Sequence, residues 1–78
     1  MTVGELFIRL VAALRAEPPK LVDNVIEEKT FGDWLARHFT LDEVEVLRDF
    51  EDRAGASDVD SLIRAAFICA GLPEPKRK

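Results

Sequence analysis

The apolar residues of this chain recur with the spacing of amphipathic helices over most of its length. Between residues 3 and 16 they stand three or four positions apart, as on one face of a helix. This first stripe consists of Val3, Leu6, Phe7, Leu10, Val11 and Leu14. A second stripe, between residues 41 and 54, consists of Val44, Leu47, Phe50 and Ala54, with Val46 at its margin. Both segments are predicted to be helices that turn one face toward a core.

Four predicted helix starts are marked by a serine or threonine with an acidic residue three positions later. In such a capping box the hydroxyl accepts a hydrogen bond from a backbone amide, and the acidic side chain reaches back to the cap amide. The pairs are Thr2–Glu5, Thr30–Asp33, Thr40–Glu43 and Ser57–Asp60. The two pairs that end in glutamate match the box closely, whereas aspartate has a shorter side chain and makes a weaker signal.

The stretch between the first and the second stripe predicts two further short helices. Pro18 and Pro19 end the first helix, because the residue before a proline avoids the helical region and proline lacks an amide donor. A helix is predicted over residues 19–29, with an apolar face of Leu21, Val22, Val25 and Ile26. Another is predicted over residues 31–39, either separate from it or merged with it around Thr30.

The last predicted helix, at about residues 58–71, is apolar on nearly every side. Between residues 61 and 72 the only charge is Arg64. A helix of this kind is buried on most sides, so it is either the central element or binds another molecule with one face. The chain is therefore predicted to be all-α, a compact orthogonal bundle of about five short helices with the last one central. This domain spans residues 1–72 and is followed by an extended basic tail at 73–78.

The composition indicates one small domain, since the chain has 78 residues. Its one cysteine, Cys69, forms no internal disulfide, which fits a reducing compartment. The longest apolar run, Ala65–Ala70, is far shorter than a membrane span. Glu5 lies where a signal peptide carries positive charge. We therefore expect no export signal, no membrane partner and a cytoplasmic location.

Acidic residues outnumber basic ones and are concentrated in one stretch. The net charge is −4, and between residues 42 and 60 eight acids and two arginines give −6. Such a field repels the phosphate backbone of nucleic acids and suits a basic protein partner. The alternative is a solvated helix face that serves only solubility. The last three residues, 76–78, are all basic.

Candidate catalytic chemistry is sparse, with one histidine (His38), one cysteine and no tyrosine. His38 is expected at the edge of the core, and Cys69, among apolar neighbours, is expected to behave as a small hydrophobe. The chain has no Cys-x-x-Cys or His-Glu-x-x-His spacing and no glycine-rich nucleotide loop. We therefore expect no enzyme activity, no cofactor and no metal.

Three short segments resemble parts of known families. Asp60-Ser61-Leu62 resembles the residues around the pantetheine-bearing serine of acyl carrier proteins, but only 17 residues follow Ser61, too few for the remaining helices of that family. Residues 34–50 resemble a helix-turn-helix, although the recognition helix would be strongly acidic. Residues 38–44 look like the start of a middle helix in death-fold-like effector-associated domains.

The function predicted by elimination is a non-catalytic protein–protein interaction module, such as an adaptor, an assembly subunit or an inhibitor. The candidate partner-binding residues are Glu45, Asp49, Asp52, Trp34 and Ile8. Trp34 anchors a partner only if it is exposed, and a core position is the alternative. For Ile8 the alternative is a peripheral contact with the core. The second hypothesis is a nucleic-acid-associated regulator that dimerises through the last helix. A homo-oligomer is compatible with either hypothesis.

Overall fold

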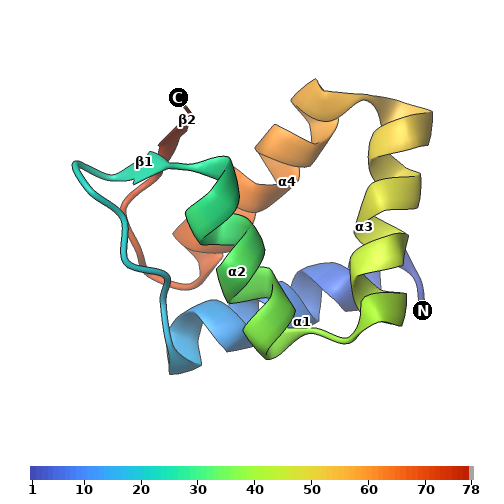
Figure 1. Cartoon of the computed structure of the whole chain (residues 1–78), viewed down its shortest axis with the longest axis horizontal. Coiled ribbons are helices and arrows are strands. Elements are labelled where there is room, and N and C mark those ends of the chain that lie inside the picture. Colours follow the sequence, from blue (N-terminus) through green and yellow to red (C-terminus); the bar gives the residue numbers. More distant parts are fainter. Residues whose placement is uncertain (78) are drawn as a thin grey trace.

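The chain forms four helices and one pair of two-residue strands over residues 1–77, the part that the computed structural model describes (Figure 1). In chain order the elements are α1 (Val3–Ala16), β1 (Val25–Ile26), α2 (Glu28–His38), α3 (Leu41–Ala54), α4 (Ala56–Cys69) and β2 (Lys76–Arg77). The predicted all-α bundle is confirmed. The number of helices in the described residues is four instead of the five that were predicted.

Helices α1 and α3 begin at the capping boxes predicted for them. The Thr2 hydroxyl accepts from the Glu5 amide at 3.1 Å, and the Glu5 carboxylate accepts from the Thr2 amide at 3.1 Å. The Thr40 hydroxyl accepts from the Glu43 amide at 3.2 Å, and the Glu43 carboxylate accepts from the Thr40 amide at 2.9 Å. Each box thus satisfies two amides that a helix start leaves without a partner.

The helix starts predicted at Thr30 and Ser57 are wrong. Helix α2 begins at Glu28, so Thr30 lies inside its first turn. Helix α4 begins at Ala56, directly after Gly55, whose φ of 97° ends α3 as predicted. The N-caps of these helices are Glu27 and Gly55, so neither Thr30 nor Ser57 occupies the cap position. The signature that ends in the shorter aspartate is a weaker marker of a helix start than the glutamate box.

Replacing Thr40 with alanine is expected to lower the free energy of unfolding by about 1 kcal/mol, the usual cost of losing an N-cap hydroxyl. Thr30→Ala is the matched control, because Thr30 is exposed and has no cap role. Alanine favours helix over threonine, so the control should be neutral or slightly stabilising. Chemical denaturation measures both variants, and equal losses at the two threonines would contradict this difference.

The segment between α1 and α2 is not helical, contrary to the helix predicted over residues 19–29. Asp23 and Asn24 have φ angles of 54° and 59°, in the left-handed region. A right-handed helix cannot pass through such residues, and Asp and Asn tolerate this region better than other non-glycine residues. The resulting turn lets the Val25 amide donate to the Val22 carbonyl at 3.1 Å and leads the chain into β1.

Strand β1 pairs in parallel with β2, which lies in the predicted basic tail. The Lys76 amide donates to the Asn24 carbonyl at 2.8 Å, and the Asn24 side-chain amide donates to the Glu74 carbonyl at 2.6 Å. Pro75, which stands between Glu74 and Lys76 in the sequence, is buried. The tail therefore lies against the loop before α2 through residue 77, while Lys78 is outside the described residues.

The fully buried core comes from α1, α2, α4 and the segment around β1, with no fully buried residue from α3. Helix α1 contributes Leu6, Leu10 and Leu14, from the stripe predicted for it. The remaining members are Ile26, Phe31, Trp34, Phe39, Val59, Ile63, Ala66 and Phe67.

Helix α4 packs against both α1 and α3, but it is not the central element that was predicted, because one of its sides stays exposed. Its inner face carries Val59, Ile63 and Phe67, whereas Ile68 is 56% exposed. Three other helices do not supply enough chain to surround a fourth, because a domain of this size has a high surface-to-volume ratio.

Candidate functional site

The three predicted acidic residues form one exposed stripe on the outer face of α3. Glu45, Asp49 and Asp52 are spaced four and three residues apart, which places them on one side of a helix. All three are exposed. This acidic stripe points away from the helix face that carries Val44 and Leu47, and Arg48 lies between the two faces.

Trp34 is completely buried and is not available as a surface anchor. Its indole Nε1 donates to the Glu17 carbonyl at 2.7 Å. Its ring stacks on Phe31 at 5.5 Å between centroids and meets the edge of Phe39 at 6.0 Å. Trp34 is therefore a core residue, which was the alternative to a partner-binding role.

Ile8 is 69% exposed, as a partner-binding residue must be. It lies in a shallow apolar depression with Val11 and Cys69, next to Arg15. The Arg15 guanidinium donates to the Cys69 carbonyl at 2.9 Å, which joins α1 to the end of α4. Ile8 lies on α1, whereas the acidic stripe lies on α3, so the predicted partner-binding residues belong to two separate helices.

Cys69, His38 and Ser61, which have nucleophilic or acid–base side chains, lie in separate parts of the structure. Cys69 is exposed beside α1, whereas His38 packs against the Trp34 ring at 5.0 Å. The His38 Nε2 is buried without a hydrogen bond among the described residues, and it faces a Glu17 carboxylate oxygen at 3.9 Å. The Ser61 hydroxyl donates to the Ser57 carbonyl within α4.

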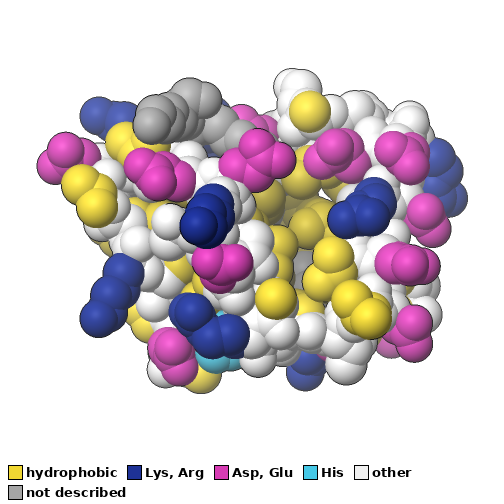
Figure 2. All heavy atoms as spheres, in the orientation of Figure 1, with side chains coloured by type: hydrophobic (Ala, Val, Ile, Leu, Met, Phe, Trp, Pro, Cys, Tyr) yellow, Lys and Arg dark blue, Asp and Glu magenta, His cyan; other side chains and the backbone are white. Residues whose placement is uncertain are grey.

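A cleft of about 340 Å³ opens between α2 and α3 beside α4, and sequence reasoning did not predict it. Its apolar lining includes Phe31, Leu35, Val44, Leu47, Val59 and Ile63. Figure 2 shows the hollow near the centre of this face, with hydrophobic walls and acidic side chains along part of its rim. One feature of the sequence could have indicated this cleft. Arg48 and Glu51 share the helix face of Val44, and these two charged residues interrupt the apolar stripe of α3.

Helix α3 is only partly covered by the rest of the domain. Its apolar residues Val44, Val46, Leu47 and Phe50 pack against the core, yet none of them is fully buried. Leu41, in its first turn, is 84% exposed. An amphipathic helix whose apolar face stays partly open beside a cleft provides surface for a partner.

An ion pair between α1 and α3 holds the cleft's α3 wall in place. The Arg9 guanidinium donates to both carboxylate oxygens of Glu43, at 2.6 and 3.0 Å, and to the His38 carbonyl at 3.3 Å. It also lies over the Phe39 ring, 5.4 Å from the centroid. Because Glu43 accepts from the Thr40 amide as well, its side chain links the α3 cap to α1.

The Glu43 contacts predict a pH dependence of stability. The Thr40 amide, followed by the Arg9 guanidinium, lowers the pKa of the Glu43 carboxyl from its ordinary value. A lowered pKa in the folded state means that the contribution is complete above the unfolded pKa and is lost as the pH falls through the folded one. Glu43→Gln should therefore lower Tm at about pH 7, and its difference from the parent should shrink at about pH 3.

Thermal unfolding followed by circular dichroism at both pH values measures this effect. Glu45→Gln is the matched control, since Glu45 is exposed on the outer face of the same helix and should leave Tm at neutral pH nearly unchanged. A Glu43→Gln difference that stays constant with pH would show that the carboxylate charge contributes nothing to the fold.

Within residues 1–77 no group of three or more His, Cys, Asp or Glu side chains is arranged to hold a metal ion. None of the described helices combines the length and the apolar character that crossing a membrane requires. Comparisons with protein-family models, with curated proteins and with solved structures find no match to this chain.

Proposed function

We propose that this domain is a non-catalytic protein–protein interaction module that binds its partner mainly through α3. The observation that carries the proposal is the incomplete covering of α3, whose apolar residues border an open cleft and include no fully buried side chain. Adaptors, assembly subunits and inhibitors all use surfaces of this kind. The free, exposed thiol of Cys69 fits a reducing compartment, and we place the protein in the cytoplasm.

The two faces of α3 have complementary tasks in this proposal. Its apolar face, with Val44 and Leu47, offers area that a partner can remove from water, and such burial supplies affinity. Its acidic stripe, with Glu45, Asp49 and Asp52, attracts a basic partner and raises the rate of encounter more than the final affinity. The partner is therefore expected to be basic, in keeping with the net charge of −4.

Reversing the charge of the acidic stripe tests the proposal. The variant Glu45→Lys/Asp49→Lys/Asp52→Lys should keep the fold, because all three side chains are exposed. It should lose a partner that the parent captures from cell extract at low salt, since steering by surface charge is screened by ions. Asp33→Lys, an exposed acid on α2, is the control and should retain that partner. Capture that is equal for all three proteins and independent of salt would overturn the role of the stripe.

A further inference from the structure

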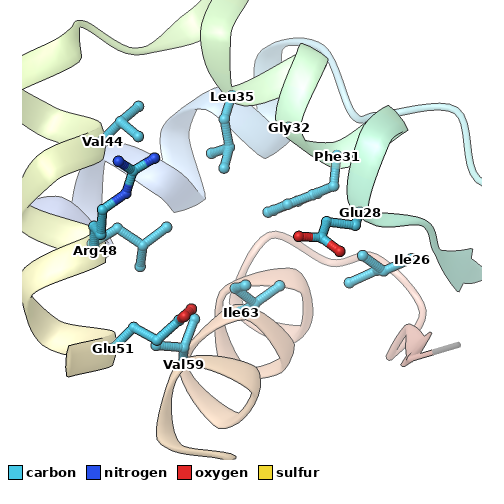
Figure 3. A pocket seen from close by; sticks show the side chains of 11 residues that line it. Ile26, Glu28, Phe31, Gly32, Leu35, Val44, Arg48, Glu51, Val59 and Ile63 are labelled. Atoms are coloured by element: carbon cyan, nitrogen blue, oxygen red, sulfur yellow. The ribbon is translucent and has the colours of Figure 1, made fainter. Parts of the chain in front are cut away.

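The cleft carries two carboxylates that form no ion pair with any side chain of residues 1–76. Glu28 on α2 and Glu51 on α3 both line it, from opposite walls. Figure 3 shows their carboxylates directed into the cleft on either side of Ile63. Among the side chains of residues 1–76, neither carboxylate has a hydrogen-bond or ion-pair partner. Two like charges that face one apolar space favour a cation between them.

The third charged residue of the cleft, Arg48, does not supply the cation between the two carboxylates. Arg48 also lines the cleft, but in Figure 3 its guanidinium extends along α3 toward Val44, away from the Glu51 carboxylate. The space above Ile63 is thus apolar at its base and acidic at its mouth. A lysine or arginine side chain complements this arrangement, because its aliphatic stem suits the apolar base and its cationic end suits the acidic mouth.

The apolar face of α3 continues past the cleft toward the start of the helix. Leu41 and Val44 are three residues apart and share one side of α3. Leu41 is 84% exposed, so this end of the face is open. A groove that runs along a helix, between two helical walls, matches in shape a third helix laid into it.

We propose that the cleft between α2 and α3 binds an amphipathic basic helix of a partner protein. The inference rests on the proposed function and names the partner's chemistry. The apolar side chains of that helix fill the space over Leu35, Leu47 and Ile63, and a lysine or arginine at its edge pairs with Glu28 and Glu51. The carboxylates select against an acidic helix, because an acid at the same position faces two like charges.

A synthetic peptide tests the inference without knowledge of the natural partner. The probe is a lysine-rich amphipathic peptide of about 16 residues, long enough to form a helix, with leucines on one face. Two matched peptides serve as controls, one with every lysine changed to glutamate and one with every leucine changed to glutamine. Titration followed by methyl NMR should give shifts at Leu35, Leu47 and Ile63 with the first peptide, and at least about tenfold weaker binding with either control.

A protein variant whose new side chain fills the cleft gives a second test of peptide binding. A Cβ added at Gly32 meets no atom within 4 Å, and Gly32 lines the cleft. Gly32→Leu should therefore keep the fold, since leucine favours helix over glycine, and should weaken peptide binding at least about tenfold. Ala36→Leu adds the same side chain to an exposed position of α2 outside the cleft lining, and should leave the affinity unchanged.

Several outcomes would overturn the inference. They are no binding of the basic peptide, equal binding of the acidic one, shifts confined to the depression around Ile8, and unchanged affinity in Gly32→Leu. A dimer of the parent chain that Gly32→Leu dissociates would assign the cleft to a second copy of the chain instead. The acidic stripe variant is tested separately, so a failure here leaves binding through the outer face of α3 to be decided by that experiment.

Discussion

Replacing Trp34 with alanine is expected to remove most of the stability of this domain. The side chain is completely buried, and truncating a buried tryptophan costs about 3–5 kcal/mol. A domain of 78 residues has a total free energy of unfolding of about 4–12 kcal/mol. At about 4–8 °C per kcal/mol, Tm should fall by roughly 12–40 °C, or the variant should be unfolded at room temperature. Thermal unfolding followed by circular dichroism measures the change.

Trp34→Phe separates the packing of the ring from its hydrogen bond. Phenylalanine keeps an aromatic contact with Phe31 but leaves the Glu17 carbonyl without its donor, which costs about 1–3 kcal/mol if the carbonyl stays out of water. This variant should therefore fall between the parent and Trp34→Ala. The parent protein has no tyrosine and no other tryptophan, so its emission reports on Trp34 alone and should be that of a buried indole. A Tm loss of only a few degrees in Trp34→Ala would contradict the core position.

The sequence predicted α1 and α3 well, because local signals and the apolar pattern agree there. At both helices a glutamate capping box marks the start, and the stripe that follows has one apolar side. α1 occupies residues 3–16, as predicted, and Gly55 ends α3 as predicted. Consistency among independent local preferences is what makes such a segment predictable.

The loop before α2 was mispredicted because its apolar residues have a helical spacing but its backbone does not. Leu21, Val22, Val25 and Ile26 suggested one face of a helix. Asp23 and Asn24 turn the chain, and Ile26 becomes part of a strand pair with residues from the other end of the chain. That partner is about 50 residues away in sequence, so no local pattern contains it.

Glu45, Asp49 and Asp52 share one exposed face and Ile8 is exposed, and their role in partner binding stays a prediction. The role of Trp34 could not be decided, because a helix pattern shows which side is apolar but not how fully it is covered. The cleft depends on the separation of α2 and α3, a tertiary distance that neither helix specifies alone. Gly32 contributes to it by placing no side chain in the gap.

Phe67→Ala is expected to cost about 3–5 kcal/mol, whereas Ile68→Ala should change the stability by no more than about 0.5 kcal/mol. The sequence cannot separate these neighbours, because both are large apolar residues in the same unbroken run. In the structure Phe67 is 2% exposed and its ring lies 6.5 Å from that of Phe31, while Ile68 is 56% exposed. Chemical denaturation of the two variants measures the difference.

The variants Phe67→Ala and Ile68→Ala also show whether the exposed apolar face of α4 contributes to an oligomer. Phe67 lines the space against Leu21 and Leu72, so it holds both the loop before α2 and the chain after α4. A large loss for Phe67→Ala with none for Ile68→Ala would show that α4 stabilises the monomer through one face only. A comparable loss for Ile68→Ala that grows with protein concentration would instead mean that its outer face is buried in an oligomer, because stability gained by association depends on concentration.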